Sequence, residues 1–303
     1  MMQQLFINWN PDVIALNLGF ISIRWYSLCW CIGLVAVYLL MHHLYRQQKI
    51  SEEQFEPMFI YCFLGILIGA RLGHCLFYEP SYFTHHITEM LLPIRETTNP
   101  ERWTKWLMWL PTGNAETHWS ATGYEGLASH GGTLGLMIAL FLYAKSQKLS
   151  FIHVLDNVGI VTPICACAIR LGNLMNSEII GKVTTLPWGF RFFHSSEALS
   201  TLDSAGLPLP RHPGQLYEAI CYACFFFIGW YFYKKYPKRV GTGFFFGLCL
   251  FLIFTSRILI EYTKENQVDF ENGMLFNMGQ LLSVPFVLLG IFCMWRAKKT
   301  TAN

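Results

Sequence analysis

Charged side chains are scarce in this sequence. Only 14% of its 303 residues are Asp, Glu, Lys or Arg, whereas a soluble domain has about 25%. Hydrophobic residues reach 53%, which leaves too little polar surface to cover a water-soluble protein of this length. The net charge of +3 is too small to indicate a nucleic-acid partner. We therefore expect lipid to be the main solvent of this chain.

Two further features are missing. None of the ten cysteines lies in a long polar connection, so they do not indicate a disulfide framework. Cys221 and Cys224 form a C-x-x-C pair, but a redox role is weakly supported because the pair lies inside an aromatic, lipid-type segment. Residues 1–10 lack the basic end and apolar run of a cleavable signal peptide. We therefore expect the membrane segments themselves to direct insertion.

Apolar segments of membrane-spanning length recur along the chain. A helix needs about 20 mostly apolar residues to cross the hydrocarbon core, and lipid cannot satisfy free backbone groups. The candidate spans are residues 25–45, 57–77, 127–144, 151–169, 216–233, 243–260 and 278–295. The sequence thus predicts an all-α polytopic membrane protein, a single domain over residues 1–303 with seven transmembrane helices. Residues 12–23 are too short to span, and we expect them along the interface.

Basic residues in the short loops predict the orientation. Clusters follow the first, third, fifth and seventh spans, at Arg46, Lys49, Lys145, Lys148, Lys234, Lys235, Lys238, Arg239, Arg296, Lys298 and Lys299. All four fall on one face, so the positive-inside rule places the C-terminus in the cytoplasm and the N-terminus outside. Two long connections, residues 78–126 and 171–213, then lie on the outer face. The second is polar and rich in Gly and Pro, and it predicts a small extracytoplasmic head between helices 4 and 5.

Several ionisable residues lie in or next to the spans, where each costs about 2.5–3.5 kcal/mol. They are Arg71, His130, Arg170, Glu218, Arg257 and Glu261. Taken singly, Arg71 and Arg170 could snorkel to the surface, and Arg257 could merely pair with Glu261 four residues on. All six, however, fall toward the outer side of the predicted bilayer. A shared polar cavity explains this, and its three arginines favour an anionic phospholipid headgroup.

The most specific feature is the polar segment 170–181, Arg-Leu-Gly-Asn-Leu-Met-Asn-Ser-Glu-Ile-Ile-Gly, which directly follows a span. It places Arg170, Asn173, Asn176 and Glu178 within nine residues. An ordinary loop needs no such combination, so we interpret the segment as functional. Glycines beside the charged residues permit close backbone approach, and these are Gly131, Gly132 and Gly172.

Six motifs in the same order resemble the prolipoprotein diacylglyceryl transferase family over nearly the whole chain. They are Arg24-Trp25-Tyr26, His130-Gly131-Gly132, the segment from Arg170 to Gly181, the run His212-Pro213-Gly214-Gln215-Leu216-Tyr217-Glu218, the pair Arg257 and Glu261, and the run Gly279 to Ser283. The connection 78–126 is longer than is usual for the family, with extra residues around 95–122.

The resemblance implies an enzyme of the bacterial inner membrane that transfers the diacylglyceryl group of phosphatidylglycerol to the lipobox cysteine of lipoprotein precursors. No metal or other cofactor is expected, since the phospholipid carries its own leaving group. Arg170 and Arg257 would hold the phosphate, with Glu261 orienting Arg257, and either His130 or Tyr26 would take the thiol proton. Asn173, Asn176 and Glu178 would fix the headgroup. The supporting residues would be Arg71, Gly131, Gly132, Gly172, His212, Gln215 and Glu218.

Three other classes of protein compete with this interpretation. An anion or lipid transporter would use the same arginines, but it requires polar residues through the full membrane depth. An intramembrane protease would need a nucleophile near His153 and Asp156, and none is evident. A membrane scaffold would not need the charged cluster.

Overall fold

The computed structural model describes residues 6–19, 22–92, 94–98, 118–121, 128–265 and 276–300, and they are predominantly helical. The chain divides into two compact units. One combines Met1–Lys49 with Ile152–Asn303, and the other is Ile50–Phe151. The positions of the two relative to each other are not determined.

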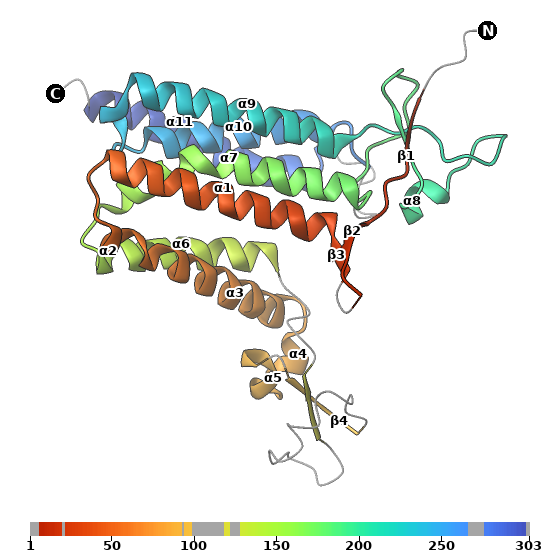
Figure 1. Cartoon of the computed structure of the whole chain (residues 1–303), viewed down its shortest axis with the longest axis horizontal. Helices are drawn as coiled ribbons and strands as arrows, with labels where there is room; N and C mark the ends of the chain where they lie inside the picture. Colours follow the sequence, from red (N-terminus) through yellow and green to blue (C-terminus); the bar gives the residue numbers. More distant parts are fainter. Residues whose placement is uncertain are drawn as a thin grey trace. The chain divides into compact units, whose positions relative to one another are not determined.

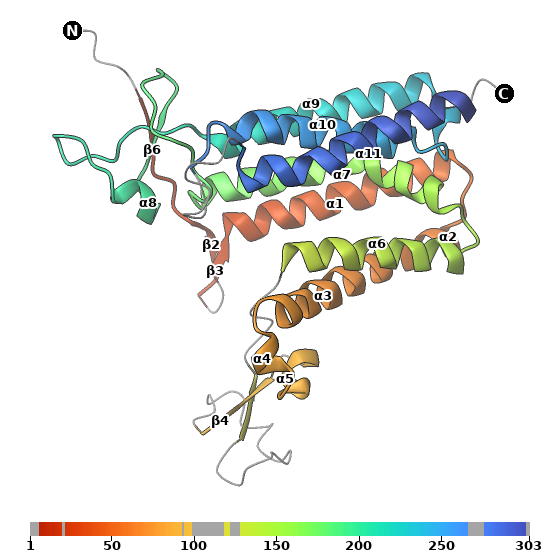
Figure 2. The same ribbon diagram turned by 180° about the vertical axis from the view of Figure 1, so that it is seen from behind.

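The first unit is a bundle of long helices that run side by side (Figures 1 and 2). They are α1 (Trp25–Gln47), α7 (Phe151–Met175), α9 (Gly214–Lys235), α10 (Phe244–Glu261) and α11 (Met278–Thr300). A 3₁₀ turn, η2 (Pro237–Arg239), connects α9 to α10. Small residues let the helices approach closely. A Cβ on Gly247 of α10, for example, would lie 2.7 Å from the Gly290 carbonyl of α11.

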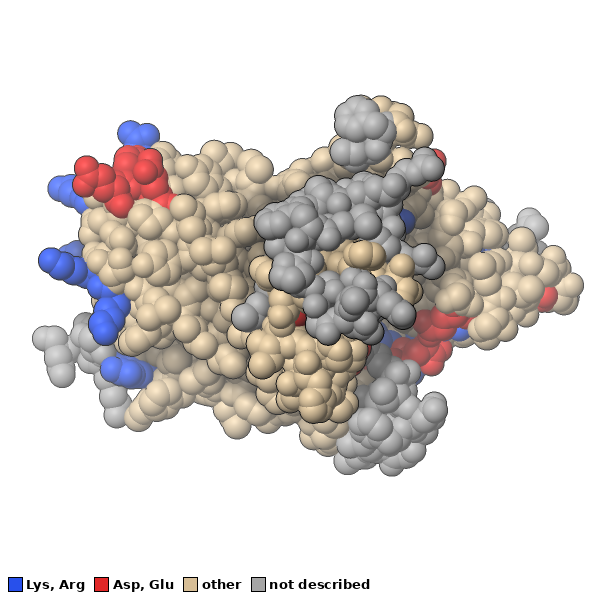
Figure 3. Space-filling view, turned by 90° about the horizontal axis from the view of Figure 1, so that it is seen from below, with Lys and Arg blue, Asp and Glu red and all other residues tan. Residues whose placement is uncertain are grey.

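Within the described part of the chain, six helical segments are long and apolar enough to cross a membrane. They are Trp25–Gln47, Glu52–Phe77, Phe151–Met175, Gly214–Lys235, Phe244–Glu261 and Met278–Lys298. A polytopic membrane protein is therefore confirmed. The predicted span at 127–144 falls on α6 (Ser129–Ser146), which is not among the six, so the count of seven stays a prediction. Figure 3 shows broad uncharged helical surfaces, with basic side chains gathered at one edge of the view.

At one end of the first unit, a small strand pair joins segments far apart in sequence. β1 (Ile7–Trp9) pairs in parallel with β6 (Phe190–Phe192), and the short α8 (Ser196–Leu199) follows. The ring of Trp9 packs on Phe190 at 5.3 Å between centroids, and its Nε1 donates to the Leu174 carbonyl at 2.9 Å. The residues predicted to lie along the interface form an antiparallel hairpin of β2 (Ile14–Asn17) and β3 (Ser22–Arg24).

Buried polar side chains at the opposite end of the first unit have structural partners. The Asp156 carboxylate, fully buried, accepts backbone N–H groups of Gly241, Gly243 and Phe246 at 2.8–2.9 Å and so caps the N-terminus of α10. The ring of His153 bonds Gln48 at 2.7 Å. These contacts account for both residues that an intramembrane protease would have used.

The second unit is built on α2 (Glu52–Phe55), α3 (Pro57–Phe77) and α6. Two short helices, α4 (Pro80–Phe83) and α5 (Ile87–Leu91), and the antiparallel pair of β4 (Ile94–Thr97) and β5 (His118–Ala121) complete it. Most of the extra residues around 95–122 lie outside the described residues.

Glycines form the seam between α3 and α6. Gly65, Gly69 and Gly73 recur every four residues on α3, and Gly131 and Gly135 do so on α6. An added Cβ on Gly69 would lie 2.4 Å from the Gly131 carbonyl, and one on Gly135 would lie 2.0 Å from the Gly65 carbonyl. Backbones thus touch directly along the seam, as in small-xxx-small packing of membrane helices.

Candidate functional site

A chain of buried charges connects α7, α9 and α10 at the end of the bundle that carries β1 and β6. Glu218 of α9 is fully buried. Its Oε2 lies 2.8 Å from Arg170 Nε in ion-pair contact, although the alignment is too poor for a hydrogen bond. Its Oε1 accepts from Lys264 Nζ at 2.9 Å, and Lys264 also reaches Glu261 at 3.3 Å. Buried charges require such partners, because the ion pairs offset the free-energy cost of removing the charges from water.

Tyr222 brings the second arginine into the same environment. The side chain is 3% exposed and lies one helical turn after Glu218 on α9. The guanidinium of Arg170 interacts with its hydroxyl, and the charges of Arg257 and Glu218 act on it as well. The Nε of Arg257 is buried and has no hydrogen-bond partner among the described residues. The charges of both arginines thus act on Tyr222, and the Nε donor of Arg257 is left unused among the described residues.

The polar segment 170–178 spans the last turns of α7 and the start of the loop that follows, so Arg170 and Asn173 are helical and not in a loop as the sequence suggested. Asn173 Nδ2 donates to Glu178 Oε2 at 2.9 Å, and Asn176 Nδ2 donates to Glu178 Oε1 at 3.0 Å. Arg170 Nη1 in turn reaches Asn173 Oδ1 at 3.4 Å. The four residues that the sequence singled out are thus one network. The carboxylate of Glu178 faces the solvent side, since this residue is exposed.

Backbone strain marks the same loop. Ser177 and Ile179 both have φ near +55°, which is the left-handed region. That conformation is unusual for any residue with a side chain and most costly for a β-branched one such as Ile179. Strain of this kind persists only where the surroundings fix the backbone.

Contacts from two other segments hold the loop in place. Gly181 N donates to the His212 carbonyl at 2.9 Å, and Lys182 N donates to the Thr263 carbonyl at 2.8 Å. A Cβ on Gly181 would lie 2.6 Å from both carbonyls, so only glycine fits. The fully buried Gln215 also donates to the Glu178 carbonyl. The supporting roles predicted for His212 and Gln215 thus correspond to contacts with this loop.

Tyr26 and His212 lie in the first unit with the charged chain. Tyr26 packs against Gly172, where an added Cβ would lie 3.0 Å from its ring. The Tyr217 hydroxyl accepts from Trp188 at 3.0 Å and lies 3.1 Å from His212 Nδ1. The hydroxyl can donate its proton to Nδ1 or accept one from it, because the direction depends on the tautomer of the neutral His212 ring. Burial lowers the pKa of His212, which favours this neutral form.

The remaining predicted site residues belong to the second unit. Arg71 is bound within that unit: Nη2 donates to the Glu89 carbonyl at 2.6 Å, and the guanidinium lies 4.9 Å from the centre of the Phe83 ring. His130 is exposed in the first turn of α6. Gly131 is part of the glycine seam, whereas an added Cβ on Gly132 would make only a 3.4 Å contact with Ala70. The close approach at Gly131 is therefore to another helix.

Two functional candidates were missed from the sequence, namely Lys264 and Tyr222. From the sequence, Lys264 is an ordinary lysine in the connection that follows the sixth predicted span. In the structure its side chain is 5% exposed and bridges two carboxylates. A spacing signal was available for both: Lys264 lies three residues after Glu261, and Tyr222 four after Glu218. Such spacings place side chains on one helix face, but burial cannot be read from them.

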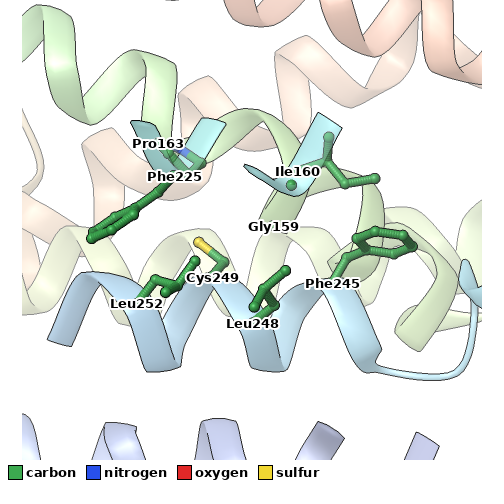
Figure 4. A pocket seen from close by; sticks show the side chains of 9 residues that line it. Gly159, Ile160, Pro163, Phe225, Phe245, Leu248, Cys249 and Leu252 are labelled. Atoms are coloured by element: carbon green, nitrogen blue, oxygen red, sulfur yellow. The ribbon is translucent and has the colours of Figure 1, made fainter. Parts of the chain in front are cut away.

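The charged chain can bind an anion, whereas a separate cavity of the bundle is apolar. The cavity among α7, α9 and α10 in Figure 4 is lined by apolar groups such as Pro163, Phe225 and Leu252, with Cys249. It contains none of the charged residues. Asp156 at the opposite end lies 14 residues before Arg170 along α7, or roughly 21 Å at 1.5 Å per residue. The polar groups thus occupy two separate ends.

Comparisons with known proteins identify the family of the chain. The model of the family described as prolipoprotein diacylglyceryl transferase matches residues 13–296. A phosphatidylglycerol–prolipoprotein diacylglyceryl transferase of Bacteroides fragilis is 53% identical over 291 residues, covering 96% of this chain and 95% of that protein. Those of Tolumonas auensis and Porphyromonas gingivalis are 38% and 37% identical, over 97% of this chain and 99% and 95% of their own. The chain belongs to the prolipoprotein diacylglyceryl transferase family.

Proposed function

We propose that this protein is a membrane enzyme that transfers the diacylglyceryl group of phosphatidylglycerol to the lipobox cysteine of lipoprotein precursors. The observation that carries the proposal is that the charges of Arg170 and Arg257 both act on Tyr222, while Arg170 is also in ion-pair contact with the buried Glu218. Two guanidinium groups at one site match the geometry of a single phosphate. The names of the relatives support the same substrates.

The reaction replaces one bond with another. The cysteine thiolate attacks the glycerol carbon that carries the phosphate ester, a carbon–sulfur thioether forms, and the carbon–oxygen bond breaks. Glycerol phosphate leaves with the electron pair of that bond. Negative charge therefore develops on the leaving oxygen, and preorganised cations beside it lower the barrier. This chemistry is consistent with the residues present and draws on no group beyond them.

The roles of the site residues follow from their positions. Arg170 and Arg257 bind the phosphate and stabilise the leaving group. Asn173, Asn176 and Glu178 form the loop that contacts the glycerol headgroup, with the exposed Glu178 carboxylate as acceptor for its hydroxyls. Because a free thiol has a pKa near 8.5, either a base or the positive field of the arginines promotes the thiolate.

Two residues compete for the base role. Tyr26 lies in the same unit as the arginines, beside Gly172. His130 belongs to the other unit and is exposed there, and His is the side chain that most often acts as a general base. The pH profiles of the Tyr26→Phe and His130→Gln enzymes distinguish them, because loss of the base removes the ascending limb of the profile.

We propose seven membrane spans, with α6 as the third, in a multi-pass protein of the bacterial inner membrane. The N-terminus is extracytoplasmic and the C-terminus cytoplasmic, because all four basic clusters lie in loops of one face. The head of residues 171–213 and the charged chain then face the extracytoplasmic side, where the cysteine of an exported precursor arrives. A transporter is not favoured, since an apolar cavity intervenes between the polar ends.

The direct test uses purified protein, phosphatidylglycerol and a lipobox peptide, with release of glycerol phosphate as the readout. A peptide with Ser in place of the acceptor Cys is the control and should release none. Arg170→Ala and Arg257→Ala should abolish release, whereas Arg46→Ala, an exposed arginine at the end of α1, should leave it unchanged. Normal turnover by either active-site variant would remove that residue from the mechanism.

A further inference from the structure

Lys264 is the one cation in the charged chain without a role in the reaction as proposed above. Its side chain is 5% exposed, and Nζ lies 2.9 Å from Glu218 Oε1 and 3.3 Å from Glu261 Oε2. Both carboxylates are buried, at 0% and 6% exposure of their side chains. The ammonium of Lys264 therefore connects two buried carboxylates, and each of these carboxylates also lies near an arginine.

Each carboxylate has a different second neighbour. Glu218 is in ion-pair contact with Arg170 at 2.8 Å through its other oxygen. Glu261 lies one helical turn after Arg257 on α10. It also packs against α11, where an added Cβ on Gly279 would lie 2.8 Å from the carboxylate. Because Glu261 is confined on that side, its negative charge is balanced by Lys264 rather than by water.

We propose that Lys264 is a positioning residue for the transfer reaction. It neutralises Glu218 and Glu261 so that Arg170 and Arg257 keep their free hydrogen-bonding capacity for the lipid phosphate. Without the ammonium, two buried carboxylates would face two guanidinium groups, and both arginines would be drawn away from the substrate. The five side chains carry one net positive charge as they stand, which suits an anion; removal of Lys264 leaves none. This inference rests on the proposed function.

The backbone around Lys264 also contacts the loop that follows α7. Lys264 forms an isolated bridge with Gly181, and Lys182 N donates to the Thr263 carbonyl at 2.8 Å. The ammonium therefore lies at the point where the end of α10 meets the loop that follows α7. Lys182 is a matched control on the same bridge, since its side chain is exposed and outside the charged chain.

The test compares four purified full-length proteins in phosphatidylglycerol vesicles with the lipobox peptide: wild type, Lys264→Met, Lys264→Arg and Lys182→Met. Steady-state kinetics are measured against phosphatidylglycerol, and the folded fraction is measured by thermal unfolding. Lys264→Met keeps the length of the side chain but removes its charge, and we expect kcat/KM per folded protein to fall about tenfold or more, with a raised KM for the lipid. Lys264→Arg should restore kcat/KM to within about threefold of wild type, and Lys182→Met should match wild type.

A purely structural role predicts a different pattern. Lys264→Met would then lower the folded fraction while kcat/KM per folded protein stayed at the wild-type value, and that result would overturn the inference. Equal losses in Lys264→Met and Lys264→Arg would overturn it too, since charge would not be what matters. If Lys264→Met does not fold, Lys264→Gln replaces it with the same expectations. Absence of transfer by the wild type would instead refute the proposed function.

Discussion

The two glycines that follow His130 should respond in opposite ways to the same substitution. Both lie in the first turns of α6, and both resembled ligand-approach glycines in the sequence. In Gly131→Ala the new methyl carbon would lie 2.3 Å from the Gly69 carbonyl of α3. In Gly132→Ala it would lie 3.4 Å from Ala70 Cβ, which is an ordinary contact. Comparison of the two variants thus distinguishes a role of Gly131 in helix packing from a role that both glycines would share in the reaction.

The magnitude follows from the geometry. A carbon atom needs about 3.2 Å from a carbonyl oxygen, so Gly131→Ala forces α3 and α6 apart by about 1 Å. Overpacking of this kind costs about 1–3 kcal/mol, and no side chain is present that could turn away. Alanine stabilises a helix by about 1 kcal/mol relative to glycine. This gain offsets part of the loss in Gly131→Ala, whereas in Gly132→Ala no overpacking opposes it. We expect the two variants to differ by about 2 kcal/mol, or about 4–8 °C in Tm.

Thermal unfolding in detergent, followed with a thiol-reactive dye, measures this difference. The thiol of Cys75 on α3 is fully buried and free, and it becomes reactive when the second unit unfolds. Gly131→Ala should lower Tm and Gly132→Ala should leave it equal or higher. Equal Tm values for the two variants would refute the seam as described. Loss of activity in Gly132→Ala at unchanged Tm would assign that glycine a role in the reaction.

Three further predictions concern other parts of the first unit. Asp156→Asn should destabilise the protein by about 2–4 kcal/mol, because a buried charged acceptor of three backbone N–H groups is lost. The turnover of the folded fraction should be unchanged, and a changed turnover would contradict a purely capping role. Ile179→Gly should relieve the strain of φ +55° and raise stability by up to about 1 kcal/mol, whereas a lower Tm would indicate that the backbone is not strained there. The hydrogen bond from Arg191 holds the pKa of Asp203 below its usual range. The contribution of Asp203 to stability is therefore fully present above the unfolded pKa near 3.9 and is lost as pH falls through the lower folded value. Amide exchange of residues 200–209 measures this local stability as a function of pH. Asp203→Asn should remove the acid dependence, and an unaltered pH profile in this variant would contradict the prediction.

The site was predictable in part because its residues are close together in sequence. Arg170, Asn173, Asn176 and Glu178 lie within nine positions, and the structure joins them in one hydrogen-bonded network at the end of α7. Glu218 and Arg257 were singled out because charge inside an apolar span is expensive. Lys264 escaped this argument, since a lysine in a loop is ordinary and only the fold reveals that two carboxylates surround it.

The sequence by itself determined the solvent and the elements. Apolar runs of about 20 residues can satisfy their backbone in lipid only as helices, so the helical character follows from local composition without knowledge of any partner. The end of α7 did not follow from the sequence, because the polar residues from Arg170 onward predicted an end at 169, whereas the helix continues to Met175.

Only the tertiary structure decided how distant segments meet. The pairing of Ile7–Trp9 with Phe190–Phe192, the capping of α10 by Asp156 and the glycine seam of α3 and α6 each join residues more than 50 positions apart. Such contacts depend on which faces and ends of the helices come together, and apolar surfaces in lipid are nearly interchangeable as partners. Packing of small residues and the pairing of buried polar groups selects among them, and these are properties of the folded chain.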